Sequence, residues 1–287
     1  MRLLFDGLTL GNGPNYYLNS DLSPALDGSL DNITINVPRT DFTKDIDDFL
    51  SERIRAFTGT IVGNDQDDFR QKKRALANRL RQTFTFTLED DYLDTDGSET
   101  IFDTYEFTGK IIDFTVNPGW ISNKSNFILQ IYCEDPNLYL LPEVNETLDI
   151  TTPGFAFPLV FPFVFSGGTT NTITVINEGL VQVYPTITIN GPLTNLTIVM
   201  NNDIFTNEQF VYTNTIVDGD SIVITPIPTD PIKVRDQDGD SVLRFTNSNF
   251  KAVTLQPGDN VLSFLADADI GENTSANIRF KSAFIAI

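Results

Sequence analysis

The sequence contains no histidine and only one cysteine, Cys133, in 287 residues. Without histidine, the chain lacks the side chain that most often acts as a general base near neutral pH, and it lacks the commonest zinc ligand. It also lacks the partner that activates serine or cysteine in Ser-His and Cys-His pairs. A single cysteine cannot form an intramolecular disulfide, so we expect assembly in a reducing cytosol, with Cys133 facing a hydrophobic core.

Basic residues are also scarce. The chain has 19 Lys and Arg against 39 Asp and Glu, which gives a formal net charge of −20. Affinity for nucleic-acid phosphates and for anionic membranes depends largely on Lys and Arg, so we expect neither specific nucleic-acid binding nor a membrane partner. An acidic surface suits solubility, and it also suits the wall of a passage that DNA crosses without adhering.

Long apolar runs are missing as well. The most apolar segment, residues 155–165 (FAFPLVFPFVF), contains two prolines and is too short to span a bilayer. The apolar run at the start of the chain is interrupted by Asp6, too early for a signal peptide. We therefore expect a soluble chain.

Short alternating strands and one helix are what the sequence does contain. Residues 83–90 (TFTFTLED) alternate strictly, and residues 104–119 and 120–136 predict a further strand pair. Residues 67–82 predict the one convincing helix. Acidic residues occupy its first turn, and an apolar stripe follows at helical spacing, formed by Phe69, Leu76, Ala77 and Leu80.

The second half of the chain shows only short strands punctuated by turns. In residues 183–202 (VYPTITINGPLTNLTIVMNN), two alternating runs flank Asn190-Gly191, which predicts a β-hairpin. Pro257-Gly258 predicts a type II turn. Strands of this length and spacing, without a helix, indicate a β-sandwich or barrel.

The composition changes after Pro142, which suggests where the domains divide. We predict a mainly β protein with an N-terminal domain of strands and one helix in residues 1–142. Residues 143–168, rich in proline, glycine and phenylalanine, are predicted to be a linker. Residues 169–287 are predicted to form a second, all-β domain.

Several segments in order resemble a known family. They are CEDPNLYLLPE (133–143), the aromatic-proline segment FPLVFPFVF (157–165), INEGLVQVYPTITINGPLTNLTI (176–198) and LQPGDNVLSF (255–264). The helix after GTIVGNDQDDF (59–69) also fits. Together these segments resemble the distal tail proteins of siphophages, the ring components that join a tail tube to a tail tip. The resemblance covers nearly the whole chain, loosely before Gly63 and most specifically between Cys133 and Phe264.

This resemblance implies a particular architecture and role. The first domain would be a β-sandwich with a helix, assembling into a six-membered belt around a channel, and the second a galectin-like β-sandwich. The implied partners are the tail tube protein, a tail-tip hub or tail-associated protein, and a receptor-binding protein. The implied location is the phage tail tip in the virion, after assembly in the host cytoplasm. A galectin-like fold does not by itself imply sugar binding, because function depends on sites rather than folds.

Basic residues concentrate on the predicted helix, and this is the best functional candidate in the sequence. One interpretation is a solvated amphipathic face. The other is that Arg70, Lys73, Arg74 and Arg81 contact acidic residues of a neighbouring subunit or of the tube. Trp120 would either anchor a subunit interface or cover the edge of its own domain.

Acidic segments offer weaker candidates. Residues 235–241 (RDQDGDS) have the alternating acids of a calcium loop, but glycine comes too early and a hairpin turn explains them better. Residues 89–91 are expected to be a solvated strand end rather than catalytic carboxylates. We therefore predict no catalytic residue, no metal site and no cofactor.

The sequence thus predicts a structural distal tail protein that forms a hexamer and is not an enzyme. The alternative is a carbohydrate-binding β-sandwich module for attachment to a host cell wall.

Overall fold

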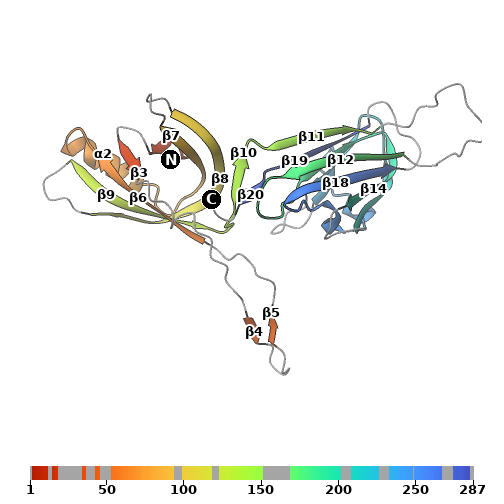
Figure 1. Ribbon diagram of the computed structural model, residues 1–287, viewed down its shortest axis with the longest axis horizontal. Coiled ribbons are helices and arrows are strands. Elements are labelled where there is room, and N and C mark those ends of the chain that lie inside the picture. Colours follow the sequence, from red (N-terminus) through yellow and green to blue (C-terminus); the bar gives the residue numbers. More distant parts are fainter. Residues whose placement is uncertain are drawn as a thin grey trace, which may run out of the picture. The chain divides into compact units, whose positions relative to one another are not determined.

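The chain is mainly β and divides into two compact units (Figure 1). The computed structural model describes residues 2–11, 15–18, 34–36, 43–45, 53–93, 99–117, 123–150, 169–201, 208–225, 233–247, 249–266 and 274–284. Unit 1 contains the described residues up to Leu141 together with Phe284, and unit 2 runs from Pro142 to Ala283. The predicted mainly β class is confirmed.

Unit 1 is built from strands and one described α-helix, α2. Its elements are β1 (Arg2–Phe5), β2 (Leu8–Leu10), β3 (Tyr16–Leu18), β4 (Thr34–Asn36), β5 (Thr43–Asp45), β6 (Arg53–Val62), α2 (Gln66–Ala77), β7 (Thr83–Leu93), β8 (Glu99–Val116), β9 (Lys124–Cys133) and β10 (Leu138–Leu141). Strands β4 and β5 pair with each other in a separate two-stranded sheet.

The main sheet of unit 1 curves until its two ends meet. Its strand order is β2-β1-β7-β8-β9-β6-β3. The backbone N–H of Gly11, after β2, donates to the carbonyl of Tyr16 in β3 at 3.2 Å. The first and last strands are therefore neighbours, and the sheet is close to a closed barrel. Closure of this kind removes exposed sheet edges.

Alternate residues of these strands form the core. The rings of Phe86 and Phe107 stack with centroids 5.0 Å apart, and Phe57 stacks on Phe107 at 6.4 Å. All three are almost fully buried, and burying each such ring stabilises the fold by roughly 1.5–3 kcal/mol. Leu76 of α2 enters the same core. Cys133 is buried there too, so its predicted position is confirmed.

The helix is shorter than the sequence predicted. It begins at Gln66, after an N-cap at Asp65, and it ends at Ala77 instead of residue 82. After the helix, Arg81 adopts a left-handed conformation (φ 67°), and its N–H donates to the carbonyl of Ile111 at 2.7 Å. This bond turns the chain into β7, so the apolar spacing of Leu80 does not continue the buried face.

The described residues of unit 2 form strands and two short 3-10 helices. Its elements are β11 (Val144–Asp149), β12 (Thr169–Asn177), β13 (Thr186–Asn190), β14 (Leu193–Asn201), β15 (Glu208–Ile216), β16 (Ser221–Thr225), β17 (Lys233–Asp236), η1 (Leu243–Phe245), η2 (Phe250–Val253), β18 (Gly258–Ala266) and β19 (Ser275–Phe280). A final short strand, β20 (Ala283–Phe284), pairs with β10.

Two sheets make up unit 2. One has the order β11-β19-β13-β16-β17, and the other has the order β12-β18-β14-β15. Ile187 and Ile189 of the first sheet are fully buried, as are Ile198 and Met200 of the second. Because alternate residues of both sheets are buried, a sandwich arrangement explains the alternating pattern of the sequence.

The predicted hairpin at Asn190-Gly191 is wrong. Strand β13 pairs with β16 and β19, whereas β14 pairs with β15 and β18 in the other sheet. The turn is therefore a corner between sheets. Its glycine is required because a Cβ on Gly191 would lie 2.5 Å from the carbonyl oxygen of Val217.

The predicted linker also begins too early. Residues 144–149 form β11, which pairs with β19 over its whole length. The apolar side chains of this segment face the interior: Leu148 is partly buried and Ile150 is fully buried. Residues 151–168, which include the phenylalanine-rich segment, lie outside the described residues. Helix α2, like the other described helices, falls short of the length and apolarity needed to cross a membrane.

Candidate assembly surface on helix α2

Helix α2 lies beside β3, β6 and β9 (Figure 1). Its inner face contributes Leu76, which is fully buried, and Phe69, which packs against the core cluster. Positions three and four residues apart share one face of a helix, so the residues opposite Leu76 point outward. This outward face is the surface to which the sequence assigned contacts with other subunits.

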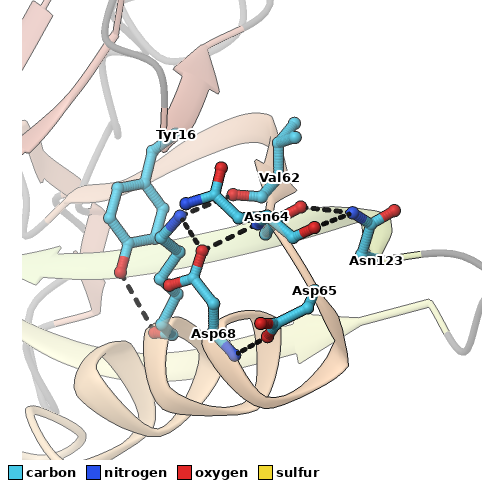
Figure 2. A network of polar contacts seen from close by, with 8 residues as sticks. Tyr16, Val62, Asn64, Asp65, Asp68 and Asn123 are labelled. Atoms are coloured by element: carbon cyan, nitrogen blue, oxygen red, sulfur yellow. Dashed lines mark hydrogen bonds and ion pairs between the residues drawn. The ribbon is translucent and has the colours of Figure 1, made fainter.

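The start of the helix is held by its own acidic residues (Figure 2). The carboxylate of Asp65 accepts a hydrogen bond from the N–H of Asp68 at 2.7 Å, as an N-cap does. The carboxylate of Asp68 accepts from the N–H of Asn64 at 2.7 Å and from Nζ of Lys72 at 2.8 Å. The first of these contacts satisfies one of the N–H groups that a helix leaves unpaired at its start, and the others fix the Asp68 carboxylate against the preceding residue and Lys72.

The same network ties the helix to the sheet. Nζ of Lys72 also donates to the carbonyl of Val62 at the end of β6 (2.9 Å), and the hydroxyl of Tyr16 in β3 donates to the carbonyl of Lys72 (3.1 Å). The side-chain amide of Asn123 donates to the carbonyls of Gly63 and Asn64 (Figure 2). The helix therefore has a defined position on unit 1, which a surface for repeated contacts requires.

Two ionisable groups in this network have shifted pKa values. The hydrogen bond from Lys72, followed by the one from the Asn64 backbone, lowers the pKa of Asp68. Burial raises the pKa of Tyr16. Both shifts favour the protonation states that make the observed contacts near neutral pH.

Three of the predicted interface residues are exposed on α2: Arg70 and Arg74 on the side away from Leu76, and Lys73 at the border of the inner face. Arg70, Lys73 and Arg74 follow the i, i+3, i+4 spacing, and all three are exposed. Arg70 pairs with Asp67 at 3.2 Å, but both side chains are largely exposed, and such pairs contribute little to stability. Within the described part of the chain, Lys73 and Arg74 form no ion pair. We call Arg70, Lys73 and Arg74 the cationic face of α2.

The remaining predicted residues lie elsewhere. Arg81 is exposed but belongs to the turn after the helix, so it is not part of the cationic face. Trp120 lies outside the described residues. Two other basic residues of this segment form contacts within unit 1. Lys72 belongs to the network above. Arg79 donates from Nε to Asp6 at 2.9 Å and from Nη1 to the carbonyl of Ala75 at 2.7 Å.

Sequence reasoning missed a buried cation, Arg55. Its side chain is fully buried, donates to the carbonyl of Pro136 at 2.6 Å, and lies 5.1 Å from the centroid of the Phe107 ring. The signal was present, because Arg55 shares its period-2 face of β6 with Phe57 and Ile61. The carbonyl that Arg55 binds belongs to Pro136, within the Asp-Pro-aromatic segment of the resemblance.

Two other segments of the resemblance contain side chains or glycines that hold turns in place. Asn260, which is fully buried, accepts from the N–H of Gln256 and donates to the carbonyls of Gln256 and Gly258, each at 2.8 Å. Gly258 has φ 89°, as a type II turn requires at its second central residue. Gly179 leaves room for the backbone of Ala283, whose carbonyl oxygen would lie 2.3 Å from an added Cβ.

The acidic segment 235–241 shows turn geometry. In residues 235–241, the N–H of Asp236 donates to the carbonyl of Asp240 at 3.0 Å, and Gly239 takes a left-handed conformation with φ 84°. The hairpin-turn interpretation accounts for both observations. Across the part of the chain that the structure describes, no group of three or more Cys, Asp or Glu residues is arranged to hold a metal ion.

Comparison with known proteins was made by sequence and by structure. No protein-family model and no curated protein matches the sequence. By its fold, the chain is similar to a hub protein of a phage adsorption apparatus. In particular, its fold is that of the Dit protein of phage SPP1, a hub protein of phages that infect Gram-positive bacteria, with a TM-score of 0.65.

The match to SPP1 Dit covers 99% of this chain and 98% of that one at 13% sequence identity. At this identity the match establishes a common fold, and at that level the resemblance to siphophage distal tail proteins is confirmed. The baseplate of phage P2 also aligns, in its calcium form and its strontium form, at TM-scores of 0.43 and 0.42. Identities are 11% and 12%, with 97–98% of each chain covered, and these scores are too low to support inference.

Proposed function

We propose that this protein is a structural distal tail protein of a long-tailed phage. It forms a hexameric ring that joins the tail tube to the tail tip and leaves a channel for DNA. The observation that carries this proposal is the alignment of both units with SPP1 Dit over nearly the full length of each chain. Its place is the tail tip of the virion, after assembly in the host cytoplasm, and it acts by binding rather than by catalysis.

The geometry of unit 1 suits this role. A ring is built from a heterologous contact, in which two different patches of the same subunit meet. The cationic face of α2 offers one such patch on a chain whose net charge is −20. The nearly closed sheet behind it supplies a rigid support.

The partners follow from the same proposal. Unit 1 docks the ring to the tail tube protein, and the proposed galectin-like unit 2 supports a tail-tip hub or tail-associated protein and a receptor-binding protein. Acidic residues on the inner wall keep passing DNA from adhering, because like charges repel phosphate. Replacing wall-lining acids with lysine should slow genome delivery, and an unchanged ejection rate would argue against this part of the proposal.

Particle imaging combined with mass measurement tests the ring. Purified protein should give a six-fold species by native mass spectrometry, or should do so when the tail tube protein is added as a template. In phage particles, the chain should form a six-fold ring between tube and tip. Its absence from that position, or its presence there without six-fold order, would refute the proposal.

A carbohydrate-binding role is the second candidate, favoured by one exposed cluster. Tyr184 is 37% exposed, its hydroxyl accepts a hydrogen bond from Gln182 at 3.0 Å, and Gln182 in turn accepts one from Gln256 at 3.2 Å. Proteins bind sugars with exposed aromatic rings that have amide groups beside them. Binding of the full chain on an array of cell-wall glycans, abolished by Tyr184→Ala, would favour this candidate, and no binding would exclude it.

A further inference from the structure

Unit 2 has four sheet edges, and the edge at β15 is covered by the chain itself. An exposed edge presents unpaired N–H and C=O groups to other strands, so proteins usually cover it or place charges on it. The N–H of Val211 donates to the side-chain oxygen of Asn247 at 3.1 Å, and the side-chain amide of Asn247 donates to the carbonyl of Gln209 at 2.8 Å. The side chain of Asn247 thus takes the place of a neighbouring strand.

The edges at β17 and β11 are protected in other ways. Strand β17 has four residues, and the chain returns along it, since the N–H of Val242 donates to the carbonyl of Val234 at 2.9 Å. Strand β11 carries Glu146 and Asp149, and charges on an edge strand disfavour pairing with a further strand. Three of the four edges therefore show the usual protections.

The fourth edge, at β12, has none of these features. The nine residues of β12 (TTNTITVIN) include no charged residue and no proline. They pair with β18 in an unbroken register, from Thr169 opposite Ala266 to Asn177 opposite Gly258, without a bulge. Among the described strands, β12 lies at the end of its sheet and pairs with β18 alone (Figure 1). A long, regular and uncharged edge of this kind is a template for an added strand.

The side chains of residues 172–176 define what an added strand must carry. On the inner row, Ile173 is partly buried and Val175 is buried, whereas Ile176 on the outer row is 54% exposed. An added strand extends both faces of the sheet, so its alternate residues lie beside these two rows. It needs apolar residues on the inner side. Asp259 lies opposite Ile176 on β18, so an acidic residue at that end of the added strand would be repelled.

Another copy of this chain is an unsuitable source of such a strand. Its own β12 could pair with β12 only about a two-fold axis, and a two-fold contact closes after two chains, so it is not the repeated contact of a ring. In unit 1 the main sheet is nearly closed by the bond from Gly11 to Tyr16, and the three-residue strands β4 and β5 pair with each other. Within the described part of the chain, no free edge of matching length remains for β12.

We propose that the free edge of β12 binds an extended segment of a different tail-tip protein, which adds a fifth strand to the sheet β12-β18-β14-β15. This inference rests on the tail-tip role proposed above, and it names the element of unit 2 that holds a partner. Main-chain hydrogen bonds supply the affinity, and the two rows of residues 172–176 select a segment with alternating apolar residues. The net charge of −20 disfavours acidic segments, because like charges repel.

Hydrogen exchange of the full chain, measured in purified form and in phage particles, tests this pairing. In the purified chain, alternate amides of residues 172–176 face the free edge and should exchange rapidly. In particles the same amides should exchange at least about tenfold more slowly, because they are bonded to the added strand. Val211, whose N–H is bonded to Asn247, is the control and should exchange at the same rate in both samples. Equal exchange of residues 172–176 in both samples would overturn the inference.

The concentration of the purified chain distinguishes the two sources of a strand. We expect exchange in β12 to be the same at low concentration and at concentrations where copies associate. Slower exchange at high concentration would show that a second copy occupies the edge, and the inference would then be wrong.

Lysines placed on the edge give a second measurement. Thr172→Lys with Thr174→Lys adds the charges that protect other edge strands. In particles of this variant, β12 should exchange as fast as in the purified chain, and one tail-tip protein should fall at least about tenfold relative to this chain, as measured by quantitative mass spectrometry. Slow exchange in β12, or unchanged protein content, would contradict the inference.

A matched control makes the same change in charge on a strand that is paired on both sides. Thr108→Lys with Thr115→Lys alters exposed positions of β8, between β7 and β9, and should leave both measurements unchanged. Circular dichroism establishes that both variants are folded. A six-fold ring in which β12 exchanges freely would refute this inference and leave the proposed function intact. Wild-type particles without a six-fold ring of this chain would refute the proposed function itself.

Discussion

The guanidinium of Arg55 donates a hydrogen bond to the carbonyl oxygen of Pro136 at 2.6 Å, and both residues are buried. The bond joins β6 to the segment that leads from β9 into β10, and it crosses 81 positions of sequence. The same guanidinium lies 5.1 Å from the centroid of the Phe107 ring. A buried cation thus holds the last turn before the chain leaves unit 1.

Replacing Arg55 with methionine should destabilise unit 1. The substitution keeps an apolar side chain of similar length but leaves the Pro136 carbonyl without its donor, which costs about 1–3 kcal/mol. Urea unfolding measures the change, and hydrogen exchange should show faster exchange in β6 and β9. Arg74→Met, at an exposed position, is the matched control and should leave the free energy of unfolding unchanged. Equal stability of both variants would contradict the role given to Arg55.

Asn260 should matter as much to the stability of unit 2 as Arg55 does to that of unit 1. Asn260→Ala removes three hydrogen bonds inside the turn 256–260 and leaves buried backbone groups unpaired, at a cost of about 1–3 kcal/mol. The exposed neighbour Asp259 provides the control, as Asp259→Ala. Thermal unfolding followed by circular dichroism compares the two, and a loss of stability in the Asp259 variant as large as in the Asn260 variant would argue against this account.

The loss of stability in acid at the first turn of α2 should depend on Asp68. Its pKa is lowered in the folded state by the hydrogen bond from Lys72 and by that from the Asn64 backbone. A lowered pKa contributes stability above the pKa of the unfolded chain, and this contribution is lost as pH falls through the folded-state pKa. Asp68→Asn should therefore be less stable than wild type at neutral pH, with a difference that shrinks in acid.

Melting temperatures measured from neutral to acidic pH test this dependence. Asp67→Asn, one residue away on the exposed side of α2, serves as the control because its carboxylate pairs with the exposed Arg70 and not with Lys72. The control should keep the pH dependence of wild type. A constant difference between Asp68→Asn and wild type at all pH values would contradict the proposed coupling.

Tyr139 should lose its hydroxyl proton at a higher pH than an ordinary tyrosine. Burial, and then its hydrogen bond to Asp135, raise the pKa of the Tyr139 hydroxyl well above its usual range. A raised pKa contributes stability below the unfolded-state pKa of about 10, and this stability is lost as pH rises through the folded-state pKa. Tyrosinate absorbance should therefore show a late phase, and Tyr139→Phe should reduce its amplitude. A late phase of unchanged size would show that other tyrosines account for it.

Local patterns in the sequence located most strands and the one described helix, because alternation and capping act over a few residues. Strands β7, β8 and β9 lie where alternating residues predicted them. The predicted end of the helix is wrong because Leu80 continues the helical spacing of apolar residues. The hydrogen bond from Arg81 to Ile111, which turns the chain away, is a long-range contact that local spacing does not reveal.

Pairing between distant segments could not be obtained in this way. Two alternating runs around Asn190-Gly191 look the same whether they pair with each other or with strands of two different sheets. Strand β11 was hidden in the predicted linker because its partner, β19, lies about 130 residues later. For the candidate site, spacing alone grouped Arg70, Lys73 and Arg74 correctly, but only the structure separates them from Lys72 and Arg79, which are occupied internally.

The pairing of β10 with β20 brings the two ends of unit 2 side by side. Unit 2 leaves unit 1 after Leu141 and the chain returns at Phe284, through two strands that pair with each other. A module whose entry and exit are adjacent can be exchanged for another without rerouting the rest of the backbone. Exchange at these two positions would replace unit 2 as a whole while leaving the backbone of unit 1 unchanged.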